Sequence, residues 1–469
     1  MKLDNLLKSF ESSVMEINGE LGDLQIAGLS YDSRTVSPGD LFFCLKGEHH
    51  DGHDFALAAI ANGACAIVVE RRINHEIPQI IVSNPRSIMG GIAQTFYGFP
   101  STEITSVGVT GTNGKTTTIS MLSEIAKAAG KTPATIGTLT GRLTTPEAPE
   151  LQRQIRKLVS EGTSFLAMEV SSHALGQNRI SKMLYDATIF TNLTLDHLDY
   201  HGDMENYYRA KSILFTSDHS KLAVVNVDNP FGQRLLKEIS IPKLSFSLTD
   251  IEIINQTLNK TTFKWGQQLI ELNTPGKFNL ENALGAAVAS EALGFDREAI
   301  ATGLENMSGI PGRFQMIQDS DNQPYVIVDY SHTPDGLERS LLAIRELSHE
   351  GEVHVVFGCG GDRDDSKRPE MGRISESLAS NVYLTSDNPR SEDQLAIIND
   401  ILSGIKDVNS VYINQDRRET IHHAVKSAGK NDVVLIAGKG CEPYQEIAGE
   451  LYSFLDIDVG REALEARQK

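Results

Sequence analysis

The sequence predicts an α/β protein of three domains, and three observations support this fold class. The chain has 469 residues, whereas one domain usually holds about 100–200. Beyond residue 100, short apolar stretches alternate with helical stretches, a pattern typical of parallel sheets covered by helices. One apolar stretch is joined to the following helix by a Gly-rich turn, as in nucleotide-binding α/β proteins.

Composition restricts the classes of function. Hydrophobic residues make up 40% of the chain and charged residues 22%, which is typical of a soluble globular protein. A formal charge of -19 argues against broad nucleic-acid binding. No apolar run approaches the ~20 residues of a membrane helix, and the first residues lack the apolar core of a signal peptide. We therefore expect a cytoplasmic protein with no membrane insertion and no nucleic-acid partner. The four cysteines lack CxxC spacing, which predicts neither a disulfide framework nor a zinc site: Cys44, Cys65, Cys359 and Cys441.

Two composition shifts predict the domain limits. A helical pattern over 88–97 stops before Gly98 and Pro100, and another over 297–307 stops before Pro311. We therefore expect domains over 1–98, 99–312 and 313–469. The elements expected in chain order are a helix over 55–62, strands over 64–69, 105–110, 164–170, 187–191 and 221–227, a hairpin-like stretch over 251–272, and strands over 325–329, 353–357, 381–385 and 432–437.

The strongest single motif is the turn Gly108-Val-Thr-Gly-Thr-Asn-Gly-Lys-Thr-Thr117. Its backbone N–H groups and the following helix N-terminus would cradle phosphate, with Lys115 reaching the β- and γ-phosphates and Thr116 on Mg²⁺. The turn departs from the general GxxxxGK[ST] pattern, because the first glycine is replaced by Val109. A guanine-reading Asn-Lys-x-Asp is missing, since Asn259-Lys260 is followed by two threonines, so adenine is favoured.

Candidate metal ligands follow two other apolar stretches. The run 165–169 ends in Glu169, where a parallel sheet would place a second Mg²⁺ ligand, although this carboxylate could equally cap a helix. The cluster Asp196-His-Leu-Asp-Tyr-His201 combines acids with two histidines four residues apart. No third nitrogen or sulfur ligand for a transition metal is nearby, so a polar loop with incidental histidines is the alternative.

Taken in order, the motifs of the chain resemble those of the Mur ligases, ATP-dependent amide-forming enzymes of peptidoglycan precursor synthesis. The resemblance covers nearly the whole chain and implies three domains: a UDP-sugar-binding domain, a central P-loop ATPase domain with a parallel sheet, and a Rossmann-like C-terminal domain that binds an amino acid. The motifs that carry it are Gly111-Thr-Asn-Gly-Lys-Thr116, Glu169-Val-Ser-Ser-His173, Thr191-Asn192, Asp196-His-Leu-Asp-Tyr-His201, Gly276-Lys-Phe-Asn-Leu-Glu-Asn-Ala283, Pro311-Gly-Arg313, Asp329-Tyr-Ser-His-Thr-Pro334 and Gly358-Cys-Gly-Gly-Asp-Arg-Asp364.

Within the family, the chain resembles the members that add the third residue of the stem peptide. The resemblance implies that ATP phosphorylates UDP-N-acetylmuramoyl-L-alanyl-D-glutamate, and that meso-2,6-diaminopimelate then attacks the acyl phosphate. Asp387-Asn-Pro-Arg390 matches diaminopimelate-adding members, whereas lysine-adding members have a more acidic sequence there. Addition of L-lysine, a folylpolyglutamate synthetase-like ligase and a P-loop switch protein are the alternatives. A monomer is expected.

The resemblance also assigns site residues. It makes Lys115, Lys211 and His197 catalytic, and it makes Thr116, Glu169, His197 and Lys211 Mg²⁺ ligands, Lys211 as its carbamate. For ATP it implies Gly111, Thr112, Asn113, Gly114, Lys115, Thr116, Thr117, Asn279, Arg313 and Asp329. For the sugar-peptide it implies Tyr31, Ser33, Glu48, His49, His50, Thr144, Thr145, Ser171, Gln177 and Arg179. For diaminopimelate it implies Arg363, Asp387, Asn388, Pro389, Arg390, Gly438 and Glu442.

Physical reasons accompany two of these assignments. A plain lysine beside Mg²⁺ would repel it, whereas a carbamate on Lys211 would supply the anionic oxygen that this cation prefers. The Arg390 fork can grip the second carboxylate of diaminopimelate, which lysine lacks, and Glu442 is available for its second ammonium. Arg313 and the loop at His332 come from beyond the second domain limit, so we expect the site to assemble by domain closure.

Overall fold

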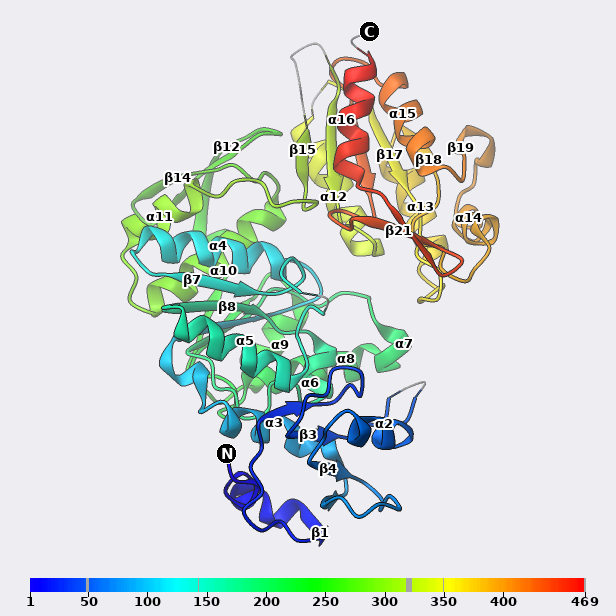
Figure 1. Ribbon diagram of the computed structural model, residues 1–469. Helices are drawn as coiled ribbons and strands as arrows, with labels where there is room; N and C mark the ends of the chain where they lie inside the picture. The colour runs from blue at the N-terminus through cyan, green and yellow to red at the C-terminus, as the bar shows by residue number, and fades with distance from the viewer. Residues whose placement is uncertain (48–49, 142, 318–322, 349, 468–469) are drawn as a thin grey trace.

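The computed structural model describes residues 1–47, 50–141, 143–317, 323–348 and 350–467. Its three main sheets follow one another in chain order, as the blue, cyan-to-green and yellow-to-red parts of Figure 1 show. Each sheet lies within one of the three predicted segments, while the domain limits themselves stay a prediction. None of the helices in these described ranges is long and apolar enough to cross a membrane.

The N-terminal sheet has the order β1-β5-β4-β3-β2, in which only the β1–β5 pair is antiparallel. Helices α1 and α3 pack on one face and α2 on the other. Asn84 caps α3 through its side chain, and Pro85 occupies the first turn, where a missing N–H costs nothing. The elements are α1 Leu3–Leu7, β1 Val14–Asn18, β2 Gly28–Ser30, β3 Asp40–Phe43, α2 Ala56–Ala61, β4 Ala66–Val69, β5 Gln79–Val82 and α3 Pro85–Phe96.

The central sheet is fully parallel, in the order β11-β10-β9-β6-β8-β7, which confirms the predicted α/β pattern. Helices α4, α10 and α11 cover one face, and α5 and α6 lie on the other with α8 and α9. The elements are β6 Thr105–Thr110, α4 Lys115–Ala128, β7 Pro133–Ile136, α5 Ala148–Ser160, β8 Phe165–Glu169, α6 Ser172–Gly176, β9 Ala187–Phe190, α7 Leu198–His201, α8 Met204–Ser212, β10 Ala223–Asn226, α9 Pro230–Glu238, β11 Lys243–Phe246, α10 Lys277–Ala292 and α11 Arg297–Glu305.

The hairpin-like stretch forms a separate antiparallel sheet of β12 Ile251–Gln256, β13 Thr261–Trp265 and β14 Gln268–Leu272. Its inward residues Phe263 and Ile270 pack with α10 and α11 in the core of the central sheet. This small sheet therefore extends the central core and leaves the phosphate loop free.

The C-terminal sheet has the order β15-β16-β20-β17-β18-β19, parallel except for the edge strand β15. Helices α12, α13 and α14 cover one face, and α15 and α16 the other. The elements are β15 Gln315–Ile317, β16 Tyr325–Asp329, α12 Pro334–Leu347, β17 Val353–Phe357, α13 Arg368–Leu378, β18 Asn381–Leu384, α14 Gln394–Leu402, β19 Tyr412–Ile413, α15 Arg417–Ser427, β20 Val433–Ala437, β21 Tyr444–Ile447, β22 Glu450–Ser453 and α16 Asp456–Arg467.

Candidate functional site

The phosphate loop connects β6 to α4 and holds its own lysine. Gly114 has φ +87°, and a Cβ there would lie 2.2 Å from Asn282 Oδ1, so only glycine fits. Lys115 Nζ donates to the carbonyl oxygens of Gly111 and Thr112 at 2.9 and 2.8 Å. Burial of this ammonium lowers its pKa. The loop thus keeps a desolvated cation over its own carbonyls.

Two of the predicted metal ligands are in direct contact. The Thr116 hydroxyl donates to Glu169 Oε1 at 2.9 Å, at the carboxyl ends of neighbouring strands β6 and β8. Glu169 is 1% exposed and also accepts from the backbone N–H of Thr138 at 2.9 Å. Arg313 Nη2 reaches the same Thr116 oxygen at 3.3 Å. A carboxylate, a hydroxyl and a guanidinium therefore converge beside the phosphate loop.

Lys211, the third predicted ligand, is a buried lysine on α8. It is 2% exposed, and its Nζ donates to the Gly111 carbonyl at 2.9 Å, the same oxygen that Lys115 contacts. Burial, and then the charge of Lys115, hold the pKa of Lys211 well below its usual range. Two lysine side chains thus donate to one carbonyl oxygen of the phosphate loop.

His197, the fourth predicted ligand, lies directly before α7 with φ +55°. Its ring nitrogen Nε2 is 3.4 Å from Asp196 Oδ2, and its side chain is 44% exposed. Its ring packs edge-on to Tyr207, over whose ring Lys211 Nζ lies at 4.6 Å. Tyr207 therefore brings His197 and Lys211 to one side of the phosphate loop, although neither contacts Glu169 among the interactions of the described residues.

Two further imidazoles pack beside His197. His173 lies 4.9 Å from His197, centroid to centroid, and His201 stacks on Tyr207 at 4.8 Å. Desolvation is the largest influence on each and holds the pKa of His173 and of His201 at about 4. Both rings are therefore neutral at pH 7.

A cavity of about 600 Å³ opens between the phosphate loop and the C-terminal sheet. Six of the residues predicted for ATP line it, while Gly111, Thr112, Lys115 and Thr116 do not. Two hydrogen bonds fix the Asp329 carboxylate, which accepts from the Ser340 hydroxyl at 2.8 Å and from the Phe314 N–H at 2.9 Å. The six predicted lining residues are Asn113, Gly114, Thr117, Asn279, Arg313 and Asp329.

Helix α12 is tied to the phosphate loop beside this cavity. Asn113 Nδ2 donates to Asp335 Oδ2 at 2.9 Å, and the Thr194 hydroxyl donates to the same oxygen at 3.2 Å. On the next turn of α12, Arg339 pairs with Asp335 at 3.1 Å and with Glu281 of α10 at 3.4 Å. Asp335, Arg339 and Glu281 were not predicted as site residues, because in the sequence they resemble ordinary charges on exposed helix faces.

A second cavity, of about 1110 Å³, lies between the histidine cluster and the C-terminal sheet. Six of the seven residues predicted for diaminopimelate line it, and Pro389 does not: Arg363, Asp387, Asn388, Arg390, Gly438 and Glu442. His197 lines the opposite side, and Tyr330 lines both this cavity and the first. Lys367, His332 and Tyr444 also line it and were not predicted as site residues.

Arg390 has an unusual backbone conformation at the wall of this cavity. Its φ is +52°, a region that non-glycine residues rarely adopt, and its N–H bonds the carbonyl of Glu446 at 3.1 Å. Its side chain donates through Nη1 to the Gly361 carbonyl at 2.6 Å, and Nε lies 3.4 Å from Glu446 Oε2. Contacts with Glu446 of β21 thus stabilise this strained backbone conformation, in which Arg390 lines the cavity.

Five of the residues predicted for the sugar-peptide belong to one hydrogen-bonded network. The Thr145 hydroxyl donates to the Glu169 carbonyl at 2.9 Å and accepts from the Ser171 N–H at 3.0 Å. Arg179 donates to the Thr145 carbonyl at 2.9 Å and to Gln177 Oε1 at 2.6 Å. Thr144 joins through Thr138, whose hydroxyl lies 3.2 Å away. Arg179 also pairs with the buried Glu147 at 3.1 Å, which offsets its charge.

The residues predicted for uridine are less connected. Burial, and next the charge of Glu147, raise the pKa of Tyr31. The Ser33 carbonyl accepts from Asn62 at 2.8 Å, and the His50 ring contacts Phe55. Glu48 and His49 lie outside the described residues. A cavity of about 910 Å³ between the first two sheets is lined by Gln177 but by none of Tyr31, Ser33 and His50.

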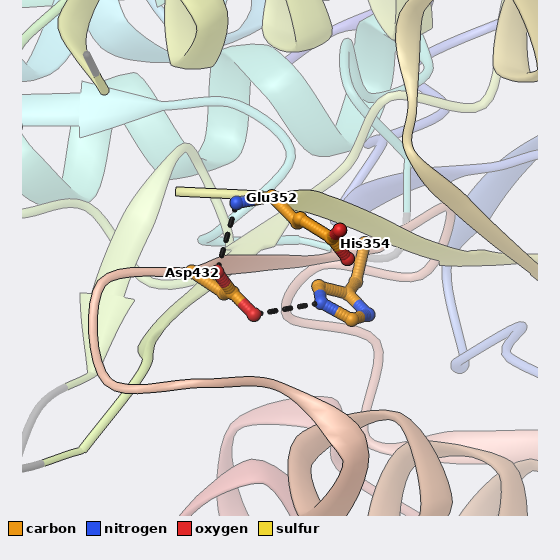
Figure 2. Close-up of side chains that lie close together, drawn as sticks. All are labelled: Glu352, His354 and Asp432. Carbon is orange, nitrogen blue, oxygen red and sulfur yellow. Dashed lines mark hydrogen bonds and ion pairs between the residues drawn. The ribbon is translucent and has the colours of Figure 1, made fainter. Parts of the chain in front are cut away.

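Figure 2 shows Glu352, His354 and Asp432, the one group of three His, Cys, Asp or Glu side chains within the described ranges whose ligand atoms lie close enough to hold a metal. Asp432 already accepts from the Glu352 N–H at 2.8 Å and the Gly429 N–H at 2.5 Å. The buried His354 ring bonds Asp432 at 3.2 Å and the Tyr383 hydroxyl at 3.1 Å. The group lies where β17 and β20 begin, at the edge opposite the cavities, and these bonds hold the strand starts together.

A phosphate loop on a parallel sheet, facing a second α/β sheet across two adjoining cavities, defines a nucleotide-dependent enzyme of several domains. The chain belongs to the Mur ligase family. Family models described as the Mur ligase family catalytic domain, the Mur ligase middle domain and the Mur ligase glutamate ligase domain match residues 25–97, 109–290 and 312–440.

Individual relatives match over almost the whole chain. The UDP-N-acetylmuramoyl-L-alanyl-D-glutamate--2,6-diaminopimelate ligase of Geobacillus kaustophilus is 43% identical over 95% of this chain and 96% of its own. A solved structure of a ligase with the same name is 33% identical, with a TM-score of 0.66 over 97% of this chain and 98% of its own. The MurF ligase of Thermotoga maritima in complex with ADP, 21% identical, shares the fold with a TM-score of 0.66 over 95% and 99% of the two chains.

Proposed function

We propose that the protein uses ATP to join meso-2,6-diaminopimelate to UDP-N-acetylmuramoyl-L-alanyl-D-glutamate. The proposal rests on the observation that two cavities adjoin: Tyr330 lines both the cavity at the phosphate loop and the cavity at Arg390. A phosphoryl donor in the first and an amine in the second would lie side by side. The relatives' names and the Asp387-Asn-Pro-Arg390 sequence favour this acceptor amine.

The chemistry has two balanced steps. First, the free carboxylate of the D-glutamate takes the γ-phosphoryl group of ATP, which gives an acyl phosphate and ADP. The amine of diaminopimelate then attacks the acyl carbon, loses a proton, and displaces inorganic phosphate as the amide forms. Lys115 donates to the loop carbonyls and Arg313 to the Thr116 hydroxyl, and both would neutralise charge on the phosphoryl oxygens, contacts worth about 10²–10³ in rate each.

Mg²⁺ is the metal that fits the donors beside the loop, because a carboxylate, a hydroxyl and a carbamate are oxygen ligands that a hard cation prefers. Thr116 would hold one Mg²⁺, and Glu169 and His197 would hold a second, with the Lys211 carbamate as a further oxygen ligand. When bound, the metal would neutralise phosphate charge. The depressed pKa of Lys211 leaves a fraction of neutral amine, which can add CO₂ and release one proton to give the carbamate.

The amino acid is proposed to bind in the second cavity. The Arg390 guanidinium would receive the second carboxylate of diaminopimelate, together with Arg363, and Glu442 would receive the second ammonium. Asp387 and Asn388 line the same wall, with Gly438 beside them. L-Lysine has the second ammonium but no second carboxylate, so an arginine-lined wall should discriminate against it.

The sugar-peptide is proposed to extend from the N-terminal sheet to the residues beside the phosphate loop. The connected residues Thr145, Ser171, Gln177 and Arg179 begin at Glu169, the proposed metal ligand, whose carbonyl accepts from the Thr145 hydroxyl. Arg179 would exchange part of its pairing with Glu147 for a substrate phosphate or carboxylate. Tyr31, Ser33, Thr144 and the segment from Glu48 to His50 complete the proposed set. We further propose that the enzyme acts in the cytoplasm as a monomer with domains 1–98, 99–312 and 313–469.

The first experiment measures phosphate release from ATP with UDP-N-acetylmuramoyl-L-alanyl-D-glutamate, comparing meso-diaminopimelate with L-lysine. Turnover with diaminopimelate alone is expected. Turnover with lysine alone would keep the ligase and overturn the specificity assigned to Arg390. Turnover with neither would favour a folylpolyglutamate synthetase-like ligase or a P-loop switch, and release without any acceptor would favour the switch.

A further inference from the structure

Lys439 is a buried cation behind the wall of the second cavity. It follows β20, its side chain is 0% exposed, and its Nζ donates to Asn388 Oδ1 at 2.9 Å and lies 3.4 Å from Glu442 Oε2. Asn388 and Glu442 line the cavity, whereas Lys439 does not. Since burying an ammonium is costly unless partners offset its charge, these two side chains are what makes its position tenable.

The three side chains fix one another's orientation. Asn388 Oδ1 also accepts from the Glu446 N–H at 2.9 Å, while Asn388 Nδ2 donates to Glu442 Oε2 at 2.8 Å. Turning this amide over would point its NH₂ group at an ammonium and at an N–H. Within the described residues, Glu442 Oε1 makes no hydrogen bond, so one carboxylate oxygen is held and the other is left for a ligand.

We propose that Lys439 is a positioning residue for the incoming amino acid, which sets the Asn388 amide and the Glu442 carboxylate in the arrangement that receives the second ammonium of a diamino acid. The inference rests on the proposed function, because it takes the second cavity as the amino-acid site. Lys439 itself touches no substrate. It acts through the two side chains that do.

Removing the charge of Lys439 should affect the second cavity and leave the ATP cavity unchanged. Without the ammonium, the Asn388 amide loses one of the two donors to its oxygen, and Glu442 loses the cation beside it and is held by the Asn388 amide alone. Affinity for the amino acid should then fall. The lining of the ATP cavity contains neither Asn388 nor Glu442, so affinity for ATP should not change.

The test is the variant Lys439→Met, which keeps the length of the side chain and removes its charge. We expect the KM for meso-diaminopimelate to rise about tenfold or more, as for loss of a charged hydrogen bond, while the KM for ATP stays within about twofold. In a Glu442→Gln background, the same change should raise the KM for diaminopimelate less than about threefold, because the partner charge is already gone.

A matched control separates positioning from folding. His354→Gln removes another buried polar side chain of the same sheet at its opposite edge, and should lower the melting temperature without changing either KM (Figure 2). If Lys439→Met behaves like this control, or raises both KM values equally, the proposal is overturned. Full additivity with Glu442→Gln would also overturn it.

Should Lys439→Met fail to fold, the double variant Lys439→Met with Glu442→Gln removes the buried pair together and leaves no unpaired charge. It is compared with Glu442→Gln alone. Equal KM values for diaminopimelate support the proposal, and a further tenfold rise overturns it. Failure of the wild-type protein to turn over diaminopimelate would instead defeat the proposed function, and the two failures are thereby distinguished.

Discussion

The side-chain amide of Asn113 donates a hydrogen bond to the carboxylate of Asp335 at 2.9 Å, across 222 residues of sequence. Asn113 belongs to the phosphate loop and Asp335 to the first turn of α12, so this bond connects the loop to a helix that covers the C-terminal sheet. Thr194 and Arg339 bind the same carboxylate. A ligand that reshapes the loop must therefore also act on α12.

Asp335→Ala should raise the KM for ATP about tenfold, because it removes a carboxylate that three donors share between the two sheets. Initial-rate kinetics with varied ATP measure this. The control is Glu346→Ala, which breaks the Lys277–Glu346 pair between α10 and α12, whose side chains are 51% and 48% exposed. An exposed pair contributes little, so the control should stay within about twofold. Equal effects of the two variants would contradict the role of Asp335.

Arg390→Ala should raise the KM for diaminopimelate about a hundredfold and that for ATP less than threefold, since Arg390 lines only the second cavity. Arg390→Lys should recover little, because a lysine cannot reproduce the fork. Kinetics with each substrate varied in turn provide the measurement. A parallel rise in both KM values would refute the specificity role.

Lys211→Ala should reduce kcat at least a thousandfold while the protein still folds, because it removes the nitrogen that is proposed to carry the carbamate and that donates to the Gly111 carbonyl. Partial recovery on adding a short carboxylate such as acetate is expected. Carbon-13 spectra of the wild-type protein equilibrated with labelled CO₂ should show one carbamate resonance that the variant lacks. Undiminished activity of the variant without added carboxylate would eliminate the carbamate hypothesis.

Stability should fall as the pH drops from about 6.5 toward 4. Burial holds the pKa of His201 and of His173 at about 4, below the value near 6.5 of an unfolded histidine. Between these values the unfolded chain binds more protons than the folded chain, so acid favours unfolding.

Urea unfolding at pH 7.5 and pH 5 measures the loss of stability between the two pH values. His201→Gln should reduce this loss. The exposed His75 provides the control, since His75→Gln should leave the pH dependence as it is. If the pH dependence of stability is the same in His201→Gln as in the wild-type protein, the loss does not come from His201.

The part of the fold with strong local patterns could be predicted from the sequence. Strand β6 has the limits expected for it, and the Gly-rich turn and α4 follow as predicted, because strand, turn and helix each leave a local signal. The strands β7 and β15 were missed. β7 is four residues long and begins with Pro133, and β15 has only three residues and pairs in the opposite direction to its neighbour. Such short edge strands depend on their partner for their structure.

The site was predictable as a set of residues but not as an arrangement. The resemblance located Thr116, Glu169 and the residues from Asp387 to Arg390, and their roles stay a prediction. It could not locate Asp335 or Lys439, because a charged residue at a helix start and a lysine in a loop are normally solvated. Thr333 and Pro334 marked the start of α12, but only the fold brings Asp335 to Asn113.

The strand order of the C-terminal sheet also determines when the enzyme becomes complete during synthesis. The strands of the first two sheets end at Val82 and Phe246, so both sheets can form while the rest of the chain is still being translated. Strand β20, which lies between β16 and β17, emerges more than a hundred residues after β16. A nascent chain thus has its phosphate loop, with Lys115 on the loop carbonyls, long before a second cavity exists. The phosphate loop is therefore made before the C-terminal residues that line either cavity.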